Sequence, residues 1–180
     1  MKSIYFLLTL FIILTSYGIQ AGVQYVKQTC TQFECRKVIT TTYVGSTTSN
    51  SRKIEKASYD NSKGKTALEK TYSFSLSTSR TMSASASVGT TVLGKEVKAS
   101  LGGDASYKRT QNYSYKVKIP AGKIGHIYLS EKTSIAKFRH VIQPQIKEGQ
   151  QNWKNNPNSS MKVEFSTVTT KTPEFSLATN

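Results

Sequence analysis

The sequence is poor in the residues from which enzymes and metalloproteins build their sites. It has two histidines, two cysteines and ten acidic residues in a chain of 180. It contains no Gly-x-Ser-x-Gly, no His-Glu-x-x-His and no glycine-rich phosphate-loop motif. His126 and His140 lie in stretches with a strand-like pattern, where a histidine is more often a surface or packing residue than a ligand. We therefore expect no catalytic residues, no cofactor, no metal site and no enzyme activity.

Long apolar runs are also absent, with one exception at the N-terminus. Lys2 precedes an apolar stretch at residues 4–14, and the small residue Ala21 follows, an order typical of a secretory signal peptide (residues 1–21). No later run is long enough to cross a bilayer as a helix. We expect one secreted module over residues 22–180. Its parts are N-terminal strands with a disulfide loop (22–70), a core hairpin with further strands (71–142), and a loop, last strand and tail (143–180).

The scarcity of cysteine limits its chemistry to one pair. Cys30 and Cys35 are the only cysteines, and an even count in an exported chain predicts a disulfide. Their spacing is not that of a Cys-x-x-Cys redox motif, and no histidine lies nearby as a second kind of zinc ligand. We expect a disulfide that closes the short loop 31–34.

Acidic residues are outnumbered by basic ones, 10 to 25, for a formal net charge of +15. A secreted protein this basic is attracted to anionic surfaces such as lipid headgroups or wall polymers. The basic residues are scattered along the chain, so the charge equally fits a role in solubility alone. No motif indicates a specific nucleic-acid partner.

The pattern that the sequence has in abundance is the alternation of apolar residues with serine or threonine. Between residues 71 and 88 one side of the pattern is mostly apolar and the other is serine or threonine. A period of two is the side-chain repeat of a β-strand, and this run is about three times as long as an ordinary strand of 5–6 residues. Such a strand either spans a membrane, which takes roughly 9–11 residues, or belongs to a sheet with one wet face.

The alternation resumes after a glycine-flanked reversal at residues 89–94 and continues over residues 96–119, which predicts a hairpin. We expect the fold class to be all-β, as an elongated module of long twisted antiparallel strands with an amphipathic Ser/Thr-rich hairpin. Further strands are expected at residues 23–44, 54–59, 124–129, 135–142 and 161–168, with turns at 60–64 and 120–122, a helical turn at 66–70, loops at 45–53 and 143–160, and a frayed tail.

Residues 72–138 resemble the pore-forming module of aerolysin-type and epsilon-toxin/mosquitocidal-toxin-like β-pore-forming proteins. The resemblance rests on the alternating arm 73–87, the return arm 96–119 and the strand end Lys-Val-Lys-Ile-Pro-Ala-Gly-Lys at 116–123. It implies long twisted strands and an amphipathic hairpin that lies against the sheet until homo-oligomers form on a target membrane, where it becomes part of a barrel. Residues 22–70 are barely long enough for the separate receptor-binding domain of that family.

The resemblance implies a secreted, pore-forming-toxin-like protein whose partner is a membrane. Arg80, the alanines 84 and 86, and the glycine pair 102–103 are poor lipid-facing residues. The alternative is therefore a non-lytic binding or structural protein that holds an anionic cell-surface polymer. Trp153 fits either an interface anchor or a cap on a sheet edge. The side chains expected to face lipid are Phe74, Leu76, Met82, Val88, Val97, Leu101 and Tyr107.

Overall fold

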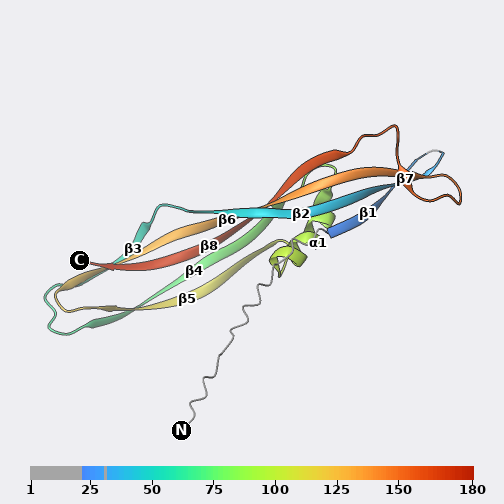
Figure 1. The fold of residues 1–180 in the computed structure, drawn as a ribbon. Coiled ribbons are helices and arrows are strands. Elements are labelled where there is room, and N and C mark those ends of the chain that lie inside the picture. The colour runs from blue at the N-terminus through green and yellow to red at the C-terminus, as the bar shows by residue number, and fades with distance from the viewer. Residues whose placement is uncertain (1–21, 31) are drawn as a thin grey trace, which may run out of the picture.

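The protein is an elongated, curled antiparallel sheet with the helix α1 (Gly89–Leu101) beside it (Figure 1). The computed structural model describes residues 22–30 and 32–180, so the expected signal peptide lies outside the described residues. The all-β prediction is confirmed. The elements are β1 (Gly22–Gln28), β2 (Glu34–Asn50), β3 (Ile54–Asn61), β4 (Leu68–Ser83), α1 (Gly89–Leu101), β5 (Tyr107–Ile119), β6 (Lys123–Lys147), β7 (Lys154–Asn155) and β8 (Lys162–Thr179).

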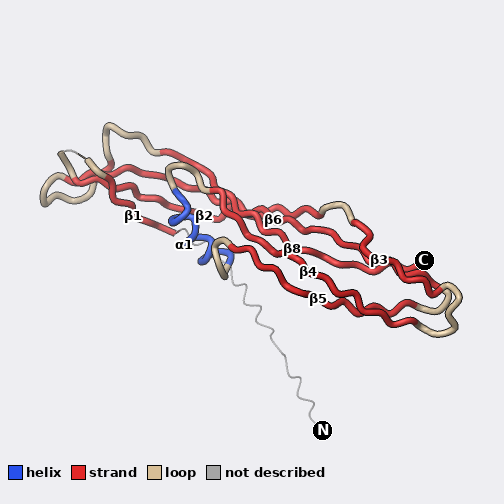
Figure 2. The backbone as a smooth tube through the Cα atoms, turned by 180° about the vertical axis from the view of Figure 1, so that it is seen from behind, coloured by secondary structure: helices blue, strands red, loops and turns tan. Residues whose placement is uncertain are grey.

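Strand β6 is the axis of the sheet. The strands follow the order β1-β2-β6-β8-β4-β5, and β3 and β7 also pair with β6. Every pairing is antiparallel. β8 pairs with β6 from Gly125 to Ile142, while β2 and β3 share its other edge. β1 and β7 lie at one end of the molecule, hereafter the disulfide end, and β3 and the C-terminus lie toward the other end, the tip (Figure 1, Figure 2).

The two faces of the sheet are covered at opposite ends. Near the disulfide end, α1 packs on the face that carries Phe138 and Ile142, and both side chains are buried. Toward the tip, the β4–β5 ribbon packs on the face that carries Ile127, which is fully buried. The positions of Ile127 and Phe138 in β6 differ by an odd number, and the strand has no register shift against β8 between them. The two side chains therefore point to opposite faces. The sheet is therefore two-layered at each end, but on alternate sides.

The disulfide prediction is confirmed. Cys30 and Cys35 are bonded, with their Cα atoms 5.9 Å apart, and they join the end of β1 to the start of β2. Cys35 is buried. Because the closed loop is short, the bond constrains this corner of the sheet more than it stabilises the whole chain.

The prediction for the second arm of the hairpin is wrong in its first half. Residues 96–101 belong to α1, and residues 102–106 form an irregular connection with bends; the strand begins only at Tyr107. The reason is that Leu93, Val97 and Leu101 are spaced four apart. They form the apolar stripe of a helix as readily as alternate positions of a strand, and an uncovered sheet face provides the partner for that stripe.

Four other expectations are wrong because polar stretches pair as strands. β2 continues through the expected loop to Asn50, and β4 begins at Leu68, where a helical turn was expected. The strands expected at 124–129 and 135–142 are one strand, which extends to Lys147 into the expected loop. The expected frayed tail is the second half of β8. In each case a neighbouring strand supplies hydrogen bonds to main-chain groups, so Ser and Thr side chains are no obstacle to pairing. The strand expected at 54–59 is confirmed and extends to Asn61, and the turn at 120–122 is confirmed.

Candidate membrane-active segment

The β4–β5 ribbon is joined to the rest of the sheet over a short length. β4 pairs with β5 from Leu68 to Arg80. Within the described residues, its ladder with β8 covers only Ser79–Ser83. At the tip, the Asn61 side chain donates hydrogen bonds to the carbonyls of Ile119 and Pro120 at 3.1 and 3.0 Å. The middle of the ribbon is therefore held to the sheet by side-chain packing.

The outward face of the ribbon is polar, as the alternation predicts. Ser73, Ser75 and Ser77 are exposed, and their partners on β5 are Ser114, Asn112 and Thr110. The hydroxyls of Ser77 and Thr110 lie 2.8 Å apart, and Ser75 donates a hydrogen bond to Asn112. These cross-strand bonds stabilise the ribbon itself and leave its pairing with the remaining sheet unchanged.

The inward face of the ribbon is aromatic near the tip. Phe74 stacks on Phe175 of β8 with ring centroids 3.9 Å apart, and Tyr72 and Tyr113 stack beside it at 5.3 and 5.7 Å. Leu76 is half-buried on the same face. Phe74 and Leu76, both expected to face lipid, thus lie between the two layers in this structure.

Arg80 ends this apolar face and holds the connection that follows β4. Its Nη1 donates hydrogen bonds to the carbonyls of Gly102 and Asp104, at 2.7 and 2.9 Å. Its guanidinium carbon lies 5.5 Å from the ring centroid of Tyr107, its register partner, and Ser106 Oγ donates a hydrogen bond to the Arg80 carbonyl at 3.0 Å. Arg80 therefore fixes where the connection of residues 84–106 leaves and re-enters the ribbon.

α1 supplies most of the buried contacts of that connection. Leu93 and Val97 are fully buried in a cluster with Phe138 and Val168, and Met82 and Leu101 pack against it. A second cluster joins Val88 and Val92 to Ile39 and Ile142. The structure thus brings Met82, Val97 and Leu101 together and places Val88 in the neighbouring cluster. Phe74, Leu76 and Tyr107 lie on the ribbon.

The sequence of α1 is a poor helix former. Its N-cap, Val88, makes no side-chain cap hydrogen bond, and the first turn has no acidic residue, so the free N–H groups and the dipole are uncompensated. Thr90, Thr91 and Val92 are β-branched, which disfavours helix. Gly94 in the interior costs roughly 1 kcal/mol relative to alanine. Since short helices are marginal even with good sequences, burial against the sheet is what keeps α1 helical.

A buried polar chain attaches the start of the connection to the sheet. His140 is fully buried, with Nδ1 2.9 Å from Thr41 Oγ1 and Nε2 2.8 Å from Ser166 Oγ. Ser166 Oγ also accepts a hydrogen bond from the Ser85 main chain at 3.0 Å. Burial lowers the pKa of His140, and nearby Glu164 partly opposes this by raising it. The neutral imidazole is therefore the form that suits this site.

The Glu164 carboxylate is the second polar attachment. It accepts hydrogen bonds from the Ser87 hydroxyl and main-chain N–H, and the Ser87 hydroxyl bond lowers the pKa of Glu164. On the other side of α1, Gln24 Nε2 donates to Glu96 Oε1 at 3.1 Å and to the Val92 carbonyl at 3.2 Å. Sequence reasoning missed these polar partners because they come from strands far apart in the chain.

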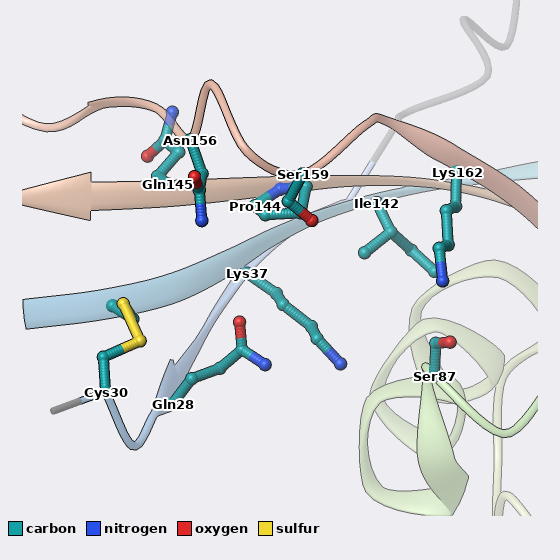
Figure 3. A pocket seen from close by; sticks show the side chains of 11 residues that line it. Gln28, Cys30, Lys37, Ser87, Ile142, Pro144, Gln145, Asn156, Ser159 and Lys162 are labelled. Carbon is teal, nitrogen blue, oxygen red and sulfur yellow. A yellow bond between two sulfur atoms is a disulfide. The ribbon is translucent and has the colours of Figure 1, made fainter.

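A small cavity of about 130 Å³ lies beside this attachment at the disulfide end (Figure 3). Lys37 of β2, Lys162 of β8 and Ser87 of the connection between β4 and α1 are among the residues that line it, with Cys30 and Ile142 on other sides. Within residues 22–30 and 32–180, no group of three or more His, Cys, Asp or Glu side chains is arranged to hold a metal ion. In the same residues no helix has both the length and the apolarity to cross a membrane.

Comparison with known proteins finds no matching family model and no matching curated protein. Among solved structures, the chain is similar to the parasporin-2 toxin of Bacillus thuringiensis, described as recognising cancer cells. The identity is 16%, with 82% of this chain and 75% of that chain covered and a TM-score of 0.40. The Mpp75Aa1.1 β-pore-forming protein from Brevibacillus laterosporus matches at 13% identity, 76% and 65% coverage and a TM-score of 0.32.

A lamprey immune protein matches at 9% identity over 76% of this chain, with a TM-score of 0.40; the chain spans about half of that protein, 48% of its length. The structural neighbours thus include β-pore-forming proteins, the class that residues 72–138 resemble in sequence pattern, at low TM-scores and low identity.

Proposed function

We propose that this is a secreted, membrane-permeabilising protein in which the connection between β4 and β5 changes from a helix to a transmembrane β-hairpin. The observation that carries the proposal is the register of the ribbon. Arg80 pairs with Tyr107, and the same antiparallel register, continued into the connection, pairs residues 82–92 with residues 95–105. Each arm then has the length that a transmembrane strand needs, roughly 9–11 residues.

The continued register separates the side chains by polarity. One face would carry mostly apolar residues: Met82, Ala84, Ala86, Val88 and Val92 from the first arm, with Val97, Ala99, Leu101 and Ala105 from the second. Gly103, Thr90 and Lys95 fall on the same face, and Lys95 lies directly beside the turn. The other face would pair Ser83 with Asp104, Ser87 with Ser100 and Thr91 with Glu96. This apolar-out, polar-in division is the pattern of a barrel strand, and Leu93 and Gly94 would form the two-residue turn.

In this register, Arg80 lies at a membrane depth where an arginine costs little. An arginine on the lipid face costs roughly 2–4 kcal/mol at mid-bilayer but only about 0–1 kcal/mol near the interface. In the proposed hairpin, Arg80 and Tyr107 lie just outside the arms 82–92 and 95–105, at the interface. Phe74 and Leu76 would then lie beyond the hydrocarbon region, whereas Met82, Val88, Val97 and Leu101 would lie within it.

Adjacent residues of α1 provide the test. Ala99 and Ser100 are both exposed near the end of the helix, so an aspartate at either position affects the soluble fold similarly. In the hairpin, Ala99 faces lipid and Ser100 faces water. We expect Ala99→Asp to abolish dye release from vesicles that contain phosphatidylserine. Ser100→Asp should retain release and make the pore more selective for cations.

Circular dichroism and thermal melting of both variants serve as the folding control. Equal leakage from Ala99→Asp and Ser100→Asp, or no leakage from the wild-type protein on vesicles to which it binds, would contradict the proposal. Binding without leakage would instead favour the alternative function, a non-lytic protein that holds an anionic surface through its basic Ser/Thr-rich strands.

A further inference from the structure

At the disulfide end, the sheet face opposite α1 has no covering layer within the described residues. In β6, Ala136, Phe138 and His140 are buried on the side of the sheet that carries α1, whereas the alternate residues Ile135, Lys137 and Arg139 are exposed. We call the exposed side the open face. It consists of the outward residues of 23–27 in β1, 34–42 in β2, 135–147 in β6 and 163–169 in β8.

Apolar and aromatic side chains that do not pack in the core are exposed on the open face. Tyr25 is 62% exposed, Val23 50%, Phe165 49% and Val163 43%. Val23 and Tyr25 lie in β1, and Val163 and Phe165 lie in β8, with β2 and β6 between these two strands. The register places all four side chains on the same side of the sheet. Single exposed apolar residues are ordinary, but several gathered on one face indicate an interaction site.

Cations are stacked on these aromatic rings. The Arg36 guanidinium lies between two rings, 4.4 Å from the Tyr25 centroid and 4.2 Å from that of Trp153, and its Nε donates to Gln145 Oε1 at 2.9 Å. Lys137 Nζ lies 4.3 Å from the centroid of Phe165. The Trp153 ring thus covers the guanidinium of a residue on the open face, and both cations are held beside aromatic surface.

The charge of the open face is almost entirely of one sign. Its strands carry the outward-pointing cations Lys27, Arg36, Lys137, Arg139 and Lys147 and a single carboxylate, Glu34. A second copy of the same face would be repelled by these cations. Aromatic and basic side chains together are typical of protein surfaces at a membrane interface, and basic residues are attracted to anionic leaflets.

We infer that the open face is a docking surface for anionic phospholipid headgroups, with its aromatic side chains at the interface and its cations on the lipid phosphates and carboxylates. This docking goes beyond the proposed pore function and does not require the hairpin to insert. It would place the protein on its target membrane through the side of the sheet opposite α1.

Vesicle cosedimentation of the purified protein tests the docking. We expect binding to phosphatidylserine/phosphatidylcholine vesicles and much weaker binding to phosphatidylcholine alone. A basic residue near an anionic leaflet contributes about 1 kcal/mol, which is roughly fivefold in affinity. Lys137→Ala/Arg139→Ala should therefore weaken binding by at least tenfold. The matched control, Arg52→Ala/Lys53→Ala, removes the same charges from an exposed loop away from the open face and should stay within about threefold of wild type.

A second pair of variants tests the aromatic part. Phe165→Thr should weaken binding several-fold, whereas Ile54→Thr, which alters an equally exposed apolar residue away from the open face, should not. Equal binding to both kinds of vesicle, an equal loss in the two double variants, or binding to cells but not to glycan-free vesicles would each overturn the inference. Leakage is measured separately, so a protein that binds through this face without leaking would refute the pore function alone.

Discussion

Gly94→Ala is a sensitive probe of whether α1 must unwind. Glycine in a helix interior costs roughly 1 kcal/mol relative to alanine, and the substitution meets no obstacle. A Cβ at this position would lie 3.5 Å from the Cβ of Ala105 and 3.9 Å from the Cε of Met82, which are ordinary contacts. We therefore expect the variant to be more stable by about 1 kcal/mol, which raises the melting temperature by roughly 2–4 °C in a domain of this size.

The same change should slow permeabilisation. If the helix must open before insertion, about 1 kcal/mol of added stability lowers the open population roughly fivefold, and the initial rate of dye release should fall by a similar factor. Loss of the glycine from the proposed Leu93–Gly94 turn acts in the same direction.

Ala99→Gly provides the control of opposite sign, because it weakens the helix at an exposed position. It should melt earlier and release dye faster. A Gly94→Ala protein with a higher melting temperature and an unchanged or faster release rate would refute helix opening as a step.

Two further predictions concern the soluble fold. Because burial lowers the pKa of His140 below its ordinary value of 6.5, the unfolded chain binds a proton more readily, and the free energy of unfolding should decrease as pH falls below about 6.5. The pKa of His126 is raised, chiefly by its hydrogen bond to Glu55, and acts in the opposite direction. In urea unfolding at pH 7.5 and 5.5, His140→Gln should thus reduce the acid loss and His126→Gln increase it; the reverse order would contradict these assignments. Phe138→Ala, at a fully buried position under α1, should cost about 3–5 kcal/mol in the same assay, and a cost below about 1 kcal/mol would show that α1 does not pack there.

The sequence predicts strands wherever one face of the pattern is clearly apolar. The alternation from Tyr72 to Met82 correctly predicts most of β4, because each second residue there is half-buried against another layer. It fails for α1, where Leu93 and Val97 satisfy both periods. The choice between helix and strand depends on the open sheet face that carries Phe138, and no local window contains that information.

The sequence also does not show where a strand continues through polar residues. The polar residues between Leu129 and Ile135 suggest a break, yet β6 runs through them because β2 and β8 pair with it there. For the candidate segment, the amphipathic ribbon could be predicted, but its attachment through His140 and Glu164 could not. Likewise, Trp153 alone could not indicate the stack with Arg36 and Tyr25, since the three residues come from distant parts of the chain.

The ladder between Ser79–Ser83 and β8 is short, and it divides the sheet into two parts that are held together to different extents. β8 is paired with β6 along its whole length, from Lys162 to Thr179, and these two strands form a frame with a much longer ladder than the one between β4 and β8. The ribbon and α1 form one continuous cover through β4. Its main-chain ladder to that frame is a seam of five residue pairs, and the remaining attachment is side-chain packing and polar contacts, those of Leu93, Val97 and Glu164 among them. Separation of this seam would free the main chain of β4 from the frame, and the buried packing of α1 is the further attachment that must open before the cover can rearrange.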